Sequence, residues 1–158
     1  MAYVNLPYGI DNFAKLRSGG CYYIDKTGLI RELLSESFDV NLITRPRRFG
    51  KTLTMSMLAE FFDIRKDSGR LFEGLEIADD SELCAEWMNR WPVLFLTLKD
   101  VEGNGYEEAY DMIQFVISSL CGEHEYLRSS DRVLETDKQI FTRLLERSGS
   151  LTDVKTSL

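Results

Sequence analysis

The feature that most constrains this chain is a loop placed between an apolar run and an amphipathic segment. The run Phe38–Thr44 is rich in aliphatic and β-branched residues and is ended by Pro46, which is typical of a buried strand. After the loop, apolar residues recur four apart at Leu53, Met57 and Phe61, which predicts a helix beginning near Gly50–Lys51. The loop backbone then lies at a helix N-terminus, where unpaired N–H groups favour an anion.

The loop combines a glycine, a lysine and a hydroxyl residue in the order that phosphate-binding loops use. Gly50-Lys51-Thr52 matches the second half of the pattern G-x-x-x-x-G-K-[ST], and Arg45 stands where the first glycine is expected. Gly50 lets the backbone approach a phosphate, Lys51 reaches the β- and γ-phosphates, and Thr52 ligates Mg²⁺. A solvated basic turn at a helix start is the alternative interpretation.

Pro46 changes the chemistry of this loop. It favours extended backbone at Arg45 and removes one N–H donor. A guanidinium can replace that donor, because Arg binds phosphate oxygens bidentately. Phe49 either anchors the loop to the core or contacts a ligand, and the anchor is favoured. The predicted nucleotide-binding residues are Arg45, Arg47, Arg48, Phe49, Gly50, Lys51 and Thr52, with Thr52 also the metal ligand.

Charge is distributed unevenly along the 158 residues. Through Thr52 there are 8 basic and 5 acidic residues, giving +3, and the remainder has 11 basic and 21 acidic residues, giving −10. This balance favours one focused anion site over a general nucleic-acid surface. The three widely spaced cysteines and the single histidine argue against a disulfide framework, a zinc site and most histidine-dependent catalysis. His124, near the end of a predicted helix, is expected at the surface.

Short β-rich runs alternate with longer helical patterns, which predicts an α/β fold. The predicted strands are Cys21–Ile24, Phe38–Thr44 and Val93–Leu98, and 66–74 is interpreted as a turn-rich connection. Further helices are predicted after Gly28, from an N-cap at Asp79, Asp80 or Ser81, at 106–126, at 137–148 and from Leu151 onward. No apolar run reaches the length of a membrane span, so a cytoplasmic location is expected.

Several segments carry a resemblance to a known family. They are Leu6-Pro7-Tyr8-Gly9-Ile10, Tyr22 to Ile30, Leu42 to Leu53 with Arg-Pro-Arg-Arg-Phe-Gly-Lys-Thr, Leu71 to Ile77, and Trp91-Pro92-Val93. Together they resemble the bacterial and archaeal AAA-ATPase-like family, many members of which carry a C-terminal PD-(D/E)XK nuclease-like domain. The resemblance implies ATP and Mg²⁺ as cofactors at Gly50, Lys51 and Thr52, and a three-layer α/β P-loop NTPase fold in which 1–158 is the N-terminal part of the nucleotide-binding domain.

The resemblance also requires a Walker B strand ending in paired acids. Val93–Leu98 is followed by Lys99 and Asp100 without a second acid, and Asp79-Asp80 is better explained as a helix cap. Walker B is therefore expected beyond Leu158. We accordingly expect an incomplete sheet, poor hydrolysis of bound ATP, and self-association through unpaired strand edges. The alternative function is a non-catalytic nucleotide- or nucleic-acid-responsive interaction module, and the overall acidity disfavours nucleic acid.

One further segment has two interpretations. Asp25, Lys26 and Thr27 follow a short aromatic run and precede a helix. They form either a turn with an Asp or Thr N-cap or, as the resemblance implies, a segment beside the nucleotide.

Overall fold

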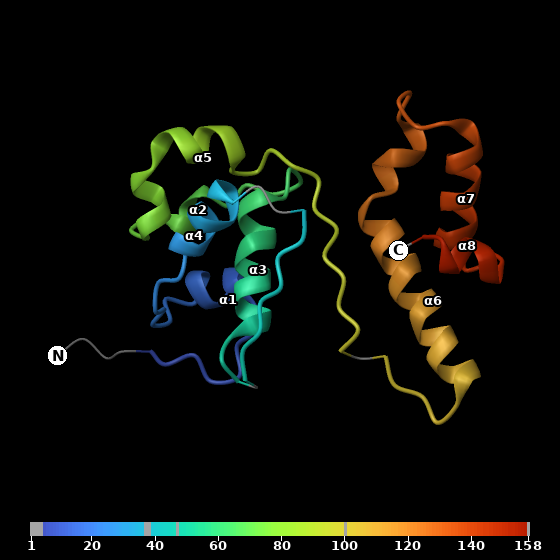
Figure 1. Cartoon of the computed structure of the whole chain (residues 1–158), viewed down its shortest axis with the longest axis horizontal. Coiled ribbons are helices and arrows are strands. Elements are labelled where there is room, and N and C mark those ends of the chain that lie inside the picture. The colour runs from blue at the N-terminus through green and yellow to red at the C-terminus, as the bar shows by residue number, and fades with distance from the viewer. Residues whose placement is uncertain (1–4, 37–38, 47, 100, 158) are drawn as a thin grey trace. The chain divides into compact units, whose positions relative to one another are not determined.

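The computed structural model describes residues 5–36, 39–46, 48–99 and 101–157 of the chain. It divides into two compact units, Met1–Val93 and Leu94–Leu158. Helices make up the regular structure of each unit in the described ranges (Figure 1). The assignment of 1–158 to one nucleotide-binding domain stays a prediction.

The first unit is built around the helix that follows the loop. This helix, α3, spans Lys51–Phe62, and it confirms the predicted start near Gly50–Lys51. Its inward-facing Met57 and Phe61 are fully buried. The other elements of the unit are α1 (Phe13–Ser18), α2 (Gly28–Ser35), α4 (Gly69–Phe72), η1 (Glu76–Asp79) and α5 (Ser81–Trp87). They enclose a core of Phe13, Ile30, Met57, Phe61, Phe72, Leu75 and Ile77.

Short polar contacts set where these helices begin. The Asn12 side chain accepts a hydrogen bond from the backbone N–H of Lys15 (2.9 Å) and so starts α1. The backbone N–H of Phe13 donates to Ser56 Oγ (3.0 Å), which joins α1 to α3. Asp80 accepts from the N–H of Leu83 (3.1 Å) and starts α5, as one of the three predicted caps.

A buried polar network holds the C-terminal end of α3. Glu60, 8% exposed, accepts hydrogen bonds from Ser68 Oγ (2.9 Å) and Lys66 Nζ (2.5 Å). The Asn89 amide donates to the carbonyl oxygens of Glu60 (3.0 Å) and Asp63 (2.9 Å). Because buried polar groups in such networks favour one arrangement, these contacts tie the C-terminal end of α3 to Lys66, Ser68 and Asn89.

The second unit packs α6 (Tyr106–Glu123) against α7 (Glu135–Leu145), with η2 (Glu125–Ser129) and α8 (Leu151–Lys155) completing it. Its core consists of Ile117, Cys121, Leu144 and Val154. Ser150 and Asp153 form a capping box at the start of α8. His124, expected at the surface, is only 2% exposed, because the chain turns from α6 directly into η2 there.

The predicted sheet is the part of the fold that is wrong. In the described ranges there is no β-sheet and no three-layer α/β arrangement, and the β-pairing found is one isolated parallel bridge between Asp63 and Trp91. Residues 21–24, 39–44 and 93–98 are not strands, and Phe38, the first residue of the second predicted strand, lies outside the described residues. Val40 is 82% exposed and Leu42 is 86% exposed. The physical reason is that a strand exists only through a neighbouring backbone, and an apolar, β-branched composition does not supply one.

The helical predictions fared better. The helices after Gly28 and from Leu151 are α2 and α8, and those predicted at 106–126 and 137–148 correspond to α6 and α7 with small changes at their ends. The connection 66–74 contains the short helix α4, which its turn-forming composition concealed.

Candidate functional site

The loop before α3 ends in a left-handed residue. Gly50 has φ 75° and ψ 23° and is followed directly by the helical Lys51. A left-handed residue beside a right-handed one turns successive backbone N–H groups toward a common point, which is an anion-binding geometry. No side chain within the described ranges caps α3. The N–H groups of its first turn are therefore free of a side-chain acceptor that would compete with a ligand.

The side chain of Lys51 folds back over the loop. Its amine donates to the backbone carbonyl of Arg45 and, at 3.5 Å, to that of Pro46. The loop therefore curves around the lysine that the sequence assigns to phosphate. Thr52, the predicted metal ligand, is exposed on the first turn of α3.

Arg48 is held in an unfavourable backbone conformation. Its φ is 68°, a left-handed value that costs a non-glycine residue about 1–2 kcal/mol. The other non-glycine residues with positive φ in the described ranges, Asn89 and Arg147, lie just past the C-terminal ends of α5 and α7, where left-handed residues are usual. Arg48 has no such explanation, and strain of this kind is often found at functional sites.

The remaining predicted site residues that the structure describes are exposed to solvent. Arg45 and Arg48 are exposed. Phe49 is 59% exposed, so the favoured interpretation of Phe49 as an anchor to the core is wrong. Arg47 lies outside the described residues. The structure thus brings Arg45, Lys51 and the N-terminus of α3 together.

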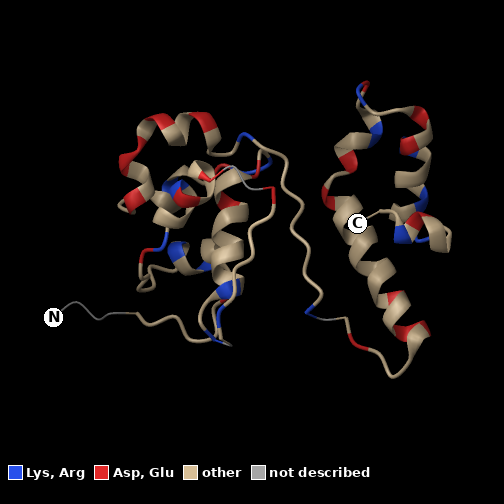
Figure 2. Ribbon diagram, in the orientation of Figure 1, with Lys and Arg blue, Asp and Glu red and all other residues tan. Residues whose placement is uncertain are grey.

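The cations of the loop have no acidic partners in the described part of the chain: no ion pair joins Arg45, Arg48 or Lys51 to a carboxylate there. Basic positions gather in the loop and at the N-terminal end of α3 (Figure 2). Among the described residues, this group of cations without carboxylate partners is where we expect an anion to bind.

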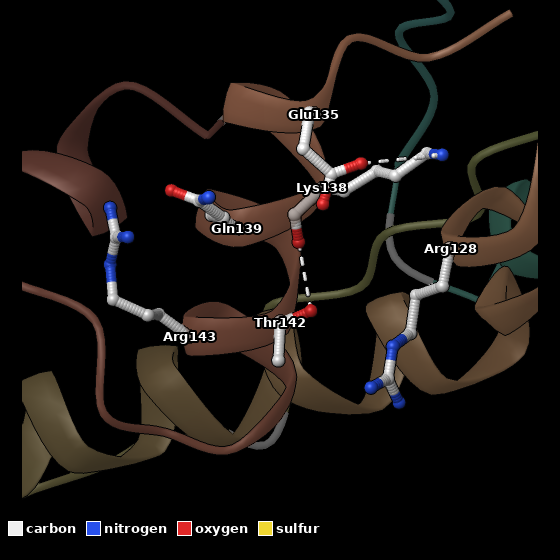
Figure 3. Close-up of a pocket in the computed structure, with 6 residues that line it drawn as sticks. All are labelled: Arg128, Glu135, Lys138, Gln139, Thr142 and Arg143. Carbon is white, nitrogen blue, oxygen red and sulfur yellow. Dashed lines mark hydrogen bonds and ion pairs between the residues drawn. The ribbon is translucent and has the colours of Figure 1, made fainter. Parts of the chain in front are cut away.

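A second group of cations, in the other unit, differs in this respect. Arg128, Lys138 and Arg143 line a shallow pocket with Glu135, Gln139 and Thr142 (Figure 3). Each of the three cations has a carboxylate partner. Arg128 pairs with Glu125 (3.3 Å), Lys138 with Glu135 (3.7 Å) and Arg143 with Asp153 (3.2 Å). The positive charges that line this pocket are already paired with carboxylates of the protein, so the pocket is not a candidate anion site.

The segment before α2 lies against η1 and is a turn, but its side chains do not cap α2. Asp25 accepts hydrogen bonds from the N–H of Thr27 (2.8 Å) and of Glu76 (2.7 Å). The buried Thr27 hydroxyl donates to Asp25 (2.7 Å) and accepts from the N–H of Ile77 (3.2 Å). Burial acts to raise the pKa of Asp25, but these donated hydrogen bonds more than offset it, so the pKa lies below its usual value. The neighbouring Lys26 reaches the loop at Gly50, a contact that sequence spacing does not reveal.

No group of three or more His, Cys, Asp or Glu side chains in the described ranges could hold a metal ion. Likewise, no helix there is long and apolar enough to cross a membrane. The Thr52 hydroxyl is compatible with Mg²⁺, which binds few protein ligands and keeps water and phosphate oxygens as the others.

Comparison with known proteins agrees with the loop sequence. A protein of Azotobacter chroococcum mcd 1, described as "Uncharacterized protein in vnfD 5'region", is 41% identical over 95 residues, which are 60% of this chain and 17% of that protein. The match thus spans about a sixth of that relative. No solved structure matches the chain. The family model described as "Predicted AAA-ATPase" matches residues 7–155, a range that includes the loop and most of each unit. The chain therefore belongs to the predicted AAA-ATPase family, as its loop sequence indicated.

Proposed function

We propose that this chain binds the phosphates of Mg-ATP at Arg45–Thr52 and is the nucleotide-binding part of a predicted AAA-ATPase. The observation that carries the proposal is the start of α3. It opens at a left-handed Gly50 with no side-chain cap, beside Lys51 and arginines that have no acidic partner in the described ranges. Family membership supports the same ligand.

The energetics favour a multiply charged ligand. One charge pair at 4 Å is worth about 4 kcal/mol at an effective dielectric constant near 20, against about 1 kcal/mol in water. The first turn of α3 adds N–H donors and a partial positive charge. Lys51 now donates to backbone carbonyls. A phosphate oxygen is a better acceptor for an ammonium group than a carbonyl is, so the exchange favours binding.

The proposed magnesium site belongs to the same loop region. The Thr52 hydroxyl is the proposed protein ligand, and phosphate oxygens and water would complete the coordination shell. The bound ion would neutralise charge on the phosphate chain. Thr52→Val should therefore reduce the gain in ATP affinity that Mg²⁺ provides, while Thr52→Ser should retain it.

Isothermal titration calorimetry of the purified chain with ATP, with and without Mg²⁺, tests the proposal. Lys51→Ala should abolish Mg-ATP binding. Lys15→Ala, which removes an exposed lysine on α1 of the same unit, should bind as the wild type does. Equal affinities for wild type and Lys51→Ala would remove the proposed function. Tight, Lys51-dependent binding of single-stranded DNA in place of ATP would favour the interaction module instead.

Hydrolysis is a separate question with its own measurement. We expect low ATP turnover from these 158 residues, because the sequence offers no convincing apolar strand ending in paired acids. Robust turnover that depends on Lys51 would show that an acid was missed. Asp100, which lies outside the described residues, would then be the first side chain to replace.

A further inference from the structure

A second lysine lies beside the phosphate loop, and it comes from a different part of the fold. The amine of Lys26 is 3.7 Å from the position that a β-carbon on Gly50 would occupy. Gly50 is the residue whose left-handed conformation opens α3. Lys26 precedes α2, so its approach to the loop depends on the folding of the whole first unit.

The residues on either side of Lys26 fix its backbone. Asp25 is hydrogen-bonded to the N–H of Glu76 in η1 (2.7 Å), and the fully buried Thr27 accepts from the N–H of Ile77 (3.2 Å). These contacts join residues about fifty positions apart in the chain. The side chains of Asp25 and Thr27 are therefore committed to structure, and Lys26, between them, is exposed.

Lys26 has no ion-pair partner in the part of the chain that the structure describes. Its amine stands near the positive end of α3 and in a loop region that already holds Lys51 and two described arginines. These like charges repel one another. An anion with several charges attracts all of them, so its binding offsets the repulsion.

We infer that Lys26 is a second phosphate-binding lysine, which contacts the polyphosphate of the bound nucleotide beside Gly50. This inference rests on the proposed function and assigns one more residue to the same site. Asp25 and Thr27 act as positioning residues, because they hold the backbone from which Lys26 reaches Gly50.

The test compares Lys26→Gln and Lys26→Arg with the wild type. The control is Lys15→Gln, since Lys15 is an exposed lysine in the same unit. The ligands are Mg-ATP and magnesium tripolyphosphate, each measured by calorimetry. Lys26→Gln should weaken both ligands by about tenfold to a hundredfold, the range expected for a lost hydrogen bond to a charged group. Lys26→Arg should retain most of the affinity, and Lys15→Gln should bind both ligands as the wild type does.

Four outcomes would overturn the inference, and they differ from one another. If Lys26→Gln leaves the Mg-ATP affinity unchanged while Lys51→Ala abolishes binding, Lys26 does not bind phosphate and the proposed function stands. Weaker ATP binding with unchanged tripolyphosphate binding places Lys26 at the nucleoside. If Lys26→Gln and Lys26→Arg lose the same ligand affinity and are both less stable in urea, the role of Lys26 is structural. Absence of ATP binding by the wild type itself refutes the proposed function first.

Discussion

The buried hydroxyl of Thr27 permits a sharp test of how the first unit is held together. Thr27 is fully buried, and its Oγ1 donates to Asp25 (2.7 Å) while accepting from the N–H of Ile77 (3.2 Å). Ile77 is also fully buried. Thr27→Val keeps the shape of the side chain and replaces the hydroxyl by a methyl group. The change removes a hydrogen bond to a carboxylate and leaves the N–H of Ile77 without its partner.

The expected cost can be worked from these two contacts. A hydrogen bond to a charged group contributes about 1.5–3 kcal/mol, and a buried donor left unpaired costs about 1–3 kcal/mol. The added methyl group regains about 0.8 kcal/mol. The net loss in free energy of unfolding is about 2–5 kcal/mol. Thr27→Ser keeps the hydroxyl and removes one buried methyl group, so it should cost only about 1 kcal/mol.

Urea unfolding followed by tryptophan fluorescence is the suitable assay. Both tryptophans of the chain, Trp87 and Trp91, lie in the first unit, so the signal reports that unit. Thr54→Val is the matched control, because Thr54 is half-buried on α3 and we expect a change within about 0.5 kcal/mol there. A Thr27→Val variant no less stable than Thr27→Ser would refute the assigned role of the hydroxyl.

Three further predictions concern other parts of the chain. Arg48→Gly should relieve the left-handed strain at this position and raise the unfolding free energy of the first unit by up to about 1 kcal/mol. The same change should weaken Mg-ATP binding. An equal gain in stability in Arg48→Ala would contradict the assignment of strain. The hydrogen bonds from Arg143 and Ser150 lower the pKa of Asp153 to about 2. Their stabilising effect is therefore complete above about pH 4 and is lost as the pH falls toward about 2, and Asp153→Asn should flatten this dependence in urea titrations followed by circular dichroism. Residues 39–44 expose the apolar side chains of Val40 and Leu42, so the chain should self-associate in light-scattering measurements over a range of concentrations. Leu42→Lys should reduce the associated fraction, and a strictly monomeric wild type would refute the expectation.

Much of the helical structure and the family were readable from the sequence. The start of α3 at Gly50–Lys51 and the cap of α5 at Asp80 follow from contacts within four residues, and such contacts are set by local sequence. The loop sequence also identified the family, which the match over 7–155 confirms. The assignment of ATP to Arg45–Thr52 came from the same local pattern and stays a proposal.

Other features depended on which distant segments meet. The apolar runs Phe38–Thr44 and Val93–Leu98 predicted strands, but a strand requires a partner backbone that composition cannot identify. Phe49 was predicted to be buried and is exposed, and His124 was predicted to be exposed and is buried. The reason is similar, because burial depends on which distant parts of the chain pack against a residue. Only the tertiary structure shows Asp25 bonded to Glu76, and Lys26 beside Gly50. Local sequence sets hydrogen bonds within one turn, whereas contacts across tens of residues form only when the whole core closes.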